Sequence, residues 1–148
     1  MYNLFFFCLF SLSTSAPTLP LQGISVRGRL VCGQYPVSGA VVKLIDFDTK
    51  DKDDLLDVSL TDESGIFSLS GFTREDEVMQ GAIKIYHNCG DRLKMFSVDG
   101  SRKKICARKV VWEVPLEYNT DGSFDRWFDI GTVNMEMKFR GEERDCKH

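Results

Sequence analysis

The sequence predicts an all-β domain, an antiparallel β-sandwich or open barrel with at most one short helix. Short segments in which apolar and polar residues alternate recur at a spacing of roughly 10 to 25 residues, and Gly, Pro and Asp residues separate them. Hydrophobic residues make up 43% of the 148-residue chain and charged residues 28%, which is enough to bury one core of ordinary domain size.

The first half of the chain contains four of the expected strands. Residues 23–32 form the first, ended by the turn 33–36, and residues 40–48 form the second, with Val42 and Leu44 on one face. After the acidic connection 46–57, residues 58–61 form a short strand. Gly65 closes the turn 62–65, where glycine adopts positive φ at low cost, and residues 66–72 alternate again.

The second half continues the pattern after one candidate helix. Residues 73–79 are the single plausible helical piece, with Thr73 as its N-cap. Residues 82–89 and 108–114 read as strands, the latter ended by Pro115. The last expected strand covers residues 128–139, and its alternate positions Val133, Met135 and Met137 share one face.

Residues 1–16 have the pattern of a secretory signal peptide. An apolar block, Leu4 to Phe10, is followed by small residues, and no charged side chain occurs before Arg27. The block is too short to span a bilayer, so no transmembrane segment is expected. We therefore expect a secreted, extracellular protein with a signal peptide at 1–16, a short N-terminal segment at 17–23 and a β domain at 24–146.

Several segments resemble the nematode transthyretin-like family of small secreted proteins. In order they are Gly28-Arg-Leu-Val-Cys32, Val41-Val-Lys-Leu-Ile45, Asp53-Asp-Leu-Leu56, Thr61-Asp-Glu-Ser-Gly-Ile-Phe67, Ile83-Lys-Ile-Tyr-His-Asn-Cys89, Ile130-Gly-Thr-Val133 and Glu143-Arg-Asp-Cys146. The resemblance implies a transthyretin-like, prealbumin-type sandwich or open barrel with Ig-like topology. It also implies a binding role, since one family member is known as a bridging factor for phosphatidylserine on dying cells.

Four cysteines remain after the expected signal peptide, and an even number in a secreted chain predicts two disulfides. They are Cys32, Cys89, Cys106 and Cys146. If the strands beside Cys89 and Cys106 form a hairpin, these two lie at the same end and pair, leaving Cys32 for Cys146. We favour that connectivity, while Cys32–Cys89 with Cys106–Cys146 stays open. A zinc site is not expected, because the sequence has no closely spaced cysteine pair such as C-x-x-C.

Catalysis is not expected. Transthyretin relatives include hydroxyisourate hydrolases, which use several histidines, an arginine and a terminal Tyr-Arg-Gly-Ser; this chain has two histidines and lacks that ending. His87 shares a face with Ile83 and Ile85, which favours a half-buried histidine bonded to the backbone or a carboxylate. No G-x-S-x-G elbow is present. We predict no enzyme, no cofactor and no metal.

Charge is divided along the chain. The net charge of −3 disfavours a nucleic-acid partner. The acidic segment 46–57 departs from the EF-hand spacing, so a solvated loop is a better interpretation than a calcium site. Basic residues flank Cys106 and are candidate contacts for an anion or a partner. They are Arg102, Lys103, Lys104, Arg108 and Lys109.

Two aromatic segments complete the candidates. Trp112 is expected in the core, and core filling is also favoured for Trp127 over an exposed interface anchor. The combined prediction is a non-catalytic extracellular binding protein or adaptor that recognises a cell-surface protein or anionic phospholipid through loops. The alternative is a carrier of a small apolar ligand in a sandwich or oligomer cavity.

Overall fold

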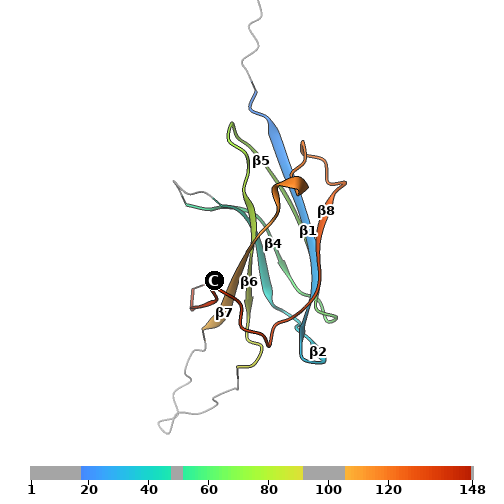
Figure 1. Ribbon diagram of the computed structural model, residues 1–148, viewed down its shortest axis with the longest axis vertical. Coiled ribbons are helices and arrows are strands. Elements are labelled where there is room, and N and C mark those ends of the chain that lie inside the picture. Colours follow the sequence, from blue (N-terminus) through green and yellow to red (C-terminus); the bar gives the residue numbers. More distant parts are fainter. Residues whose placement is uncertain (1–17, 48–51, 92–105, 148) are drawn as a thin grey trace, which may run out of the picture.

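Two β-sheets pack face to face in the computed structural model, which describes residues 18–47, 52–91 and 106–147 (Figure 1). The strands are β1 (Leu21–Cys32), β2 (Tyr35–Pro36), β3 (Val41–Asp46), β4 (Asp54–Leu60), β5 (Ile66–Arg74), β6 (Gly81–His87), β7 (Ala107–Glu113), β8 (Trp127–Asn134) and β9 (Glu143–Asp145). The predicted all-β sandwich is confirmed. The expected signal peptide at 1–16 lies outside the described residues.

Each sheet has a long strand pairing that sets its register. In the four-stranded sheet β1 pairs antiparallel with β5 and β2, and parallel with β8. The five-stranded sheet has the order β4-β3-β6-β7-β9, and all its pairs are antiparallel. The expected hairpin of residues 82–89 and 108–114 is therefore present as β6 and β7.

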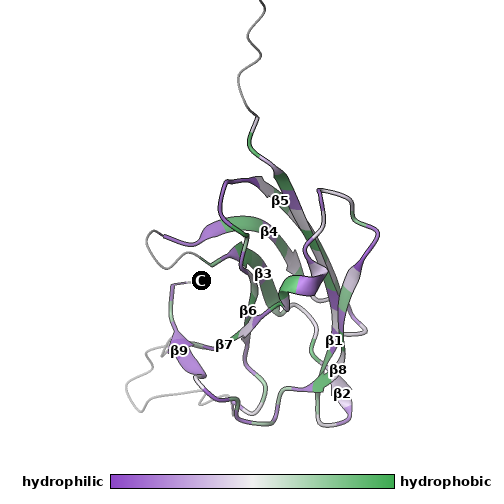
Figure 2. Cartoon of the chain, turned by 45° about the horizontal axis from the view of Figure 1, so that its top comes forward, coloured by the Kyte–Doolittle hydropathy of each residue, from purple (hydrophilic) through white to green (hydrophobic). Residues whose placement is uncertain are grey.

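The core lies between the two sheets and follows the alternation in sequence. In β1 the side chains of Ile24, Val26 and Leu30 are fully buried, whereas Arg27 and Arg29 between them are exposed. β6 is the middle strand of its sheet, so nearly all of it is buried. Figure 2 shows hydrophobic residues in β3, inside its sheet, and a hydrophilic β9 at the sheet edge.

Gly65 is required by its turn, as predicted. Its φ is +78°, and a Cβ there would lie 2.2 Å from the carbonyl oxygen of Leu30. That close approach is fixed by the hydrogen bond from the Leu30 amide to the Gly65 carbonyl, at 2.8 Å. Only a residue without a side chain fits between β1 and β5 at this point.

The predicted helix at 73–79 is wrong. Thr73 and Arg74 continue β5, and the following backbone bonds to Gln22 of β1 instead of to itself. The Gln22 amide donates to the carbonyls of Glu75 and Glu77, and its oxygen accepts the Met79 amide. Tertiary hydrogen bonds thus satisfy the groups that a helix would have paired. Within the described residues the single helical turn is a 3₁₀ turn, η1 (Leu116–Tyr118).

The last predicted strand, 128–139, is also too long. β8 ends at Asn134, whose side-chain oxygen accepts the amides of Gly33 and Glu136 and turns the chain. The chain then crosses to the other sheet, where β9 pairs with β7. β9 was not predicted from the sequence. In the part of the chain that the structure describes, no helix is long and apolar enough to cross a membrane.

Candidate functional site

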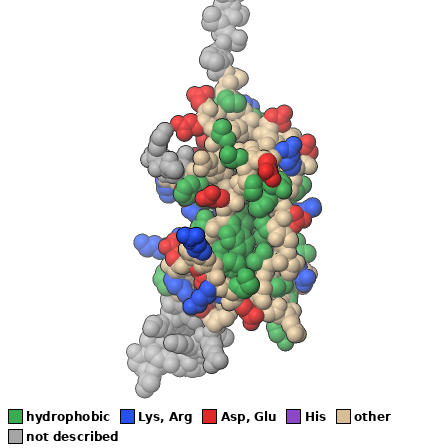
Figure 3. All heavy atoms as spheres, viewed as in Figure 1, with side chains coloured by type: hydrophobic (Ala, Val, Ile, Leu, Met, Phe, Trp, Pro, Cys, Tyr) green, Lys and Arg blue, Asp and Glu red, His purple; other side chains and the backbone are tan. Residues whose placement is uncertain are grey.

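The two sheets close along one side and diverge along the other. On the closed side β4 lies against β5; the Ser70 amide donates to the Asp57 carboxylate, and a Cβ on Gly71 would lie 2.5 Å from Leu56. On the other side β7 and β8 are the neighbouring strands, and they are not paired. Hydrophobic side chains are visible between β7 and β8 in Figure 3, which has the same view as Figure 1. The divergence leaves part of the core open to the surface.

A groove of about 650 Å³ follows this open side. Inward-facing side chains of β7 and β8 form its apolar wall, and alternate residues of the same strands form its rim. Trp112, Phe128, Ile130 and Val133 are partly buried and pack against the core. The lining is completed by Val111, Glu113 and Asp129, which are exposed.

Aromatic pairs extend the apolar surface beyond the groove lining. Trp112 meets Phe139 edge to face, with ring centroids 5.2 Å apart, and Tyr118 of η1 meets Phe128 at 4.9 Å. Phe139 belongs to the segment that carries the chain from β8 to β9, whereas Tyr118 follows β7. Rings from both connecting segments therefore support the groove wall.

Gly28 allows one wall residue to reach its position. A Cβ on Gly28 would lie 2.3 Å from the Ile130 side chain, and the register between β1 and β8 shifts between Arg27 and Arg29. Ile130 thus packs directly over the backbone of β1. The groove depends on this glycine as well as on its apolar lining.

The rim of the groove carries acidic side chains. Asp129 accepts a hydrogen bond from Arg27 at 2.8 Å, and the Gly131 amide together with this guanidinium lowers the pKa of the Asp129 carboxyl. Arg27 also lies 5.8 Å from the centroid of the Trp127 ring. Among the described residues no cation pairs with Glu113. Within the described structure the rim therefore has one carboxylate paired with a cation, Asp129, and one without such a partner, Glu113.

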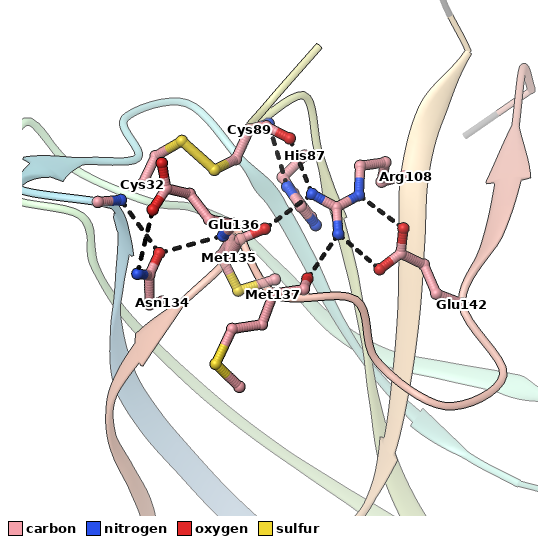
Figure 4. The surroundings of a disulfide bond; sticks show 10 residues. Cys32, His87, Cys89, Arg108, Asn134, Met135, Glu136, Met137 and Glu142 are labelled. Atoms are coloured by element: carbon pink, nitrogen blue, oxygen red, sulfur yellow. Dashed lines mark hydrogen bonds and ion pairs between the residues drawn. A yellow bond between two sulfur atoms is a disulfide. The ribbon is translucent and has the colours of Figure 1, made fainter.

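Arg108 is not an anion contact, contrary to the sequence prediction. Its side chain is buried and all five of its N–H donors are used within the protein (Figure 4). Two bonds of 2.6 and 2.7 Å go to the Glu142 carboxylate. The other three go to the carbonyls of Cys89, Met135 and Met137, at 2.7 to 2.8 Å. Arg108 thus fastens the segment after β8 to β6 and β7.

The rest of the basic cluster is divided. Lys109 forms an ion pair with Glu143 of β9, and the hydrogen bond with that carboxylate raises the pKa of the Lys109 ammonium. Arg102, Lys103 and Lys104 lie outside the described residues. Within the described part, therefore, the predicted basic rim consists of residues that already have acidic partners.

His87 is hydrogen-bonded to the backbone, and it is more buried than the half expected from sequence. Its side chain is 2% exposed, and Nδ1 accepts the Cys89 amide at 3.2 Å. Burial and then the nearby Arg108 charge lower the pKa of His87 to about 4. Its Nε2 has no hydrogen-bond partner in the described structure. The side chain is therefore neutral at pH 7.

The disulfides have the connectivity that we did not favour. Cys32 pairs with Cys89, and Cys106 pairs with Cys146. The favoured pairs, Cys89–Cys106 and Cys32–Cys146, are wrong because the prediction lacked β9. Pairing of Ala107 with Asp145 places Cys146 beside Cys106, while the chain after β6 brings Cys89 to the end of β1.

The described carboxylates of the acidic segment lie apart from one another in their contacts. Asp46 accepts the Gln80 amide, Asp53 pairs with Lys84, and Asp57 accepts the Ser70 amide, so these carboxylates have separate partners. Residues 48–51 lie outside the described structure. Among the described residues no group of three or more His, Cys, Asp or Glu side chains is placed to hold a metal ion.

The groove itself was missed from sequence. Trp112 was expected in the core and is part of the groove wall, where it stays partly buried. The sequence showed alternating apolar residues in both strands. It did not show which strands lie beside them. Because β8 pairs with β1 across about a hundred residues of sequence, no local pattern shows that its other edge is open.

Comparisons with known proteins agree with this fold. The model of the Transthyretin-like family matches residues 27–115. Transthyretin-like protein 33 of Caenorhabditis elegans is 39% identical, over 86% of this chain and 83% of its own length. Transthyretin-like protein 46 is 40% identical, over 97% and 76%, and transthyretin-like protein 5 is 35% identical, over 86% of each; both are from the same nematode.

Solved structures are more distant. A 9R-lipoxygenase from Cyanothece has a TM-score of 0.41 and 18% identity, covering 84% of this chain and 18% of its own. Similarity at that level specifies no shared activity.

The family match spans more than half of the sequence, and the relatives align over most of their own length. The chain therefore belongs to the transthyretin-like family.

Proposed function

We propose that this protein is a non-catalytic extracellular binding domain whose binding site is the open groove between β7 and β8. The observation that carries the proposal is the exposure of core-type side chains there. Ligand sites in proteins are concave and mostly apolar, with few polar groups that fix orientation. Trp112, Phe128 and Ile130 supply the apolar wall, and Glu113 and Asp129 the polar rim.

Two further features support an extracellular setting. The two disulfides are of a kind that persists in oxidising compartments. The apolar leader at 1–16 has the composition of an export signal. Both fit a domain that meets its ligand outside the cell.

An apolar ligand is favoured over an anionic headgroup at the described surface. The two described residues of the basic cluster, Arg108 and Lys109, are paired with Glu142 and Glu143. A ligand that approaches the groove instead meets aromatic and aliphatic side chains with a carboxylate beside them. This arrangement supports the second hypothesis from sequence, an apolar ligand held in the sandwich.

The test uses an uncharged fluorescent probe, Nile red, with the disulfide-bonded secreted chain. We expect saturable binding that Val111→Asp and Val133→Asp each weaken by about tenfold, because each places a charge against the apolar probe. Val58→Asp is the matched control, since Val58 is 51% exposed on β4 and does not line the groove.

Circular dichroism verifies that each variant is folded. If Val133→Asp unfolds, Val111→Asp decides, because Val111 is already exposed on the rim. Absence of saturable probe binding to the unmodified chain, or equal weakening by the Val58 control, would reject the groove as the binding site.

A further inference from the structure

The groove is bordered by two strand edges that have no strand partner in the described structure. β9 pairs with β7 only at Ala107 to Lys109, so the following stretch, Val110 to Glu113, is unpaired on the side away from β6. β8 pairs with β1 along one edge, and its other edge faces the groove. Both edges present backbone N–H and C=O groups that a further strand can satisfy.

The side chains next to these edges define what such a strand would carry. Neighbouring residues of a strand point to opposite faces of the sheet. Trp112, Phe128 and Ile130 point inward and are partly buried, whereas Glu113 and Asp129 point outward and are exposed. A strand lying between β7 and β8 would therefore place every second side chain against the apolar wall. Its remaining side chains would lie on the outer face, next to the carboxylates of Glu113 and Asp129.

We propose that the groove receives an extended peptide segment of alternating apolar and basic residues, which adds as a strand between the free edges of β7 and β8. This inference rests on the proposed function of the groove as the binding site and names the class of ligand. Backbone hydrogen bonds would supply affinity, and the alternate side chains would supply specificity.

The carboxylate of Glu113 is the reason for basic residues in the proposed ligand. Asp129 is engaged by Arg27, but Glu113 has no cation among the described residues. A lysine or arginine on the outward face of the added strand would pair with Glu113. The opposite choice, an acidic outer face, would place like charges side by side across neighbouring strands, which is unfavourable.

The test compares three labelled peptides of eight residues by fluorescence polarisation with the disulfide-bonded chain. The first alternates valine and lysine. The second alternates valine and glutamate, which reverses the outer charge. The third is the valine–lysine peptide with methyl groups on the lysine backbone nitrogens, which removes strand hydrogen bonds while the side chains stay the same.

We expect the first peptide to bind and the other two to bind about tenfold more weakly or worse, which is the scale of one or two net hydrogen bonds. Glu113→Gln should weaken the valine–lysine peptide several-fold. Glu63→Gln is the matched control, because Glu63 is an exposed carboxylate in the turn before β5 and is absent from the groove. Amide hydrogen exchange should slow at residues 110–113 and 127–134 when the peptide is bound.

The outcomes separate this inference from the proposed function. Equal binding of the methylated peptide would overturn strand addition. Binding of Nile red without binding of any peptide would overturn the peptide ligand and leave the groove as an apolar site, whereas failure of both probes would reject both. A dimer in sedimentation with protected amides in β7 and β8 would assign the groove to a second copy and overturn the peptide partner.

Discussion

His87 makes the stability of this domain depend on pH in a calculable way. Burial is the main reason why the pKa of His87 falls from 6.5 to about 4, and the Arg108 charge contributes further. The unfolded chain therefore binds a proton at His87 near pH 6.5, but the folded chain binds it only near pH 4. Above pH 6.5 His87 is neutral in both states and costs the fold nothing. As the pH falls from 6.5 to 4, the unfolded chain takes up the proton first, and the free energy of unfolding decreases.

The expected size of the loss follows from the two pKa values. Linkage gives a decrease in the free energy of unfolding of about 2 kcal/mol at pH 5 and about 3 kcal/mol at pH 4, relative to pH 7. Carboxylates that titrate near pH 4 add their own dependence, so the His87 contribution must be isolated by a variant that cannot titrate there.

Urea unfolding from pH 7 to pH 4 measures this contribution. His87→Gln removes the titration, so its stability should decrease by about 2 kcal/mol less than that of the unmodified chain between pH 7 and pH 5. Parallel pH curves for the unmodified chain and His87→Gln, or an NMR titration of His87 near pH 6.5, would refute the reasoning.

Two further predictions concern the packing of the two sheets. Arg108→Leu should lower the free energy of unfolding by about 3–5 kcal/mol, because it leaves the Glu142 carboxylate without its partner. In a double-mutant cycle with Glu142→Gln, the two losses of stability should be strongly non-additive. Additive losses would contradict the contact. Gly65→Ala should cost about 1–3 kcal/mol more than Gly39→Ala in urea unfolding, since both glycines have positive φ but only at Gly65 does a Cβ meet a backbone atom, the Leu30 oxygen. Equal costs would contradict that reason.

Much of the fold was predictable because its signals are local. The alternation of Ile24 and Val26 with Arg27 and Arg29 needs only the two-residue period of a strand and one buried face. The turn at Gly65 has its own residue signal. Both depend on neighbours within a few positions, so they are visible before any tertiary contact is known.

The errors share the opposite property. The segment 73–79 was expected to be helical, but Gln22, more than fifty residues earlier, supplies its hydrogen bonds. Arg108 was expected at the surface, but its partner Glu142 lies in the segment between β8 and β9, and β9 was not predicted. In each case a long-range polar contact replaced the local preference, and no local pattern reports which distant group will be near.

The sequence by itself determined that this is an all-β member of the transthyretin-like family with cysteines suited to two disulfides. Only the tertiary structure decided which cysteines pair, because the pairing depends on β9 lying beside β7. It also decided that β7 and β8 stay apart. Strand periodicity specifies which face of a strand is buried, but the neighbour along each edge is set by the packing of whole sheets. Among the described strands, the groove lies where the facing edges of β7 and β8 are not paired.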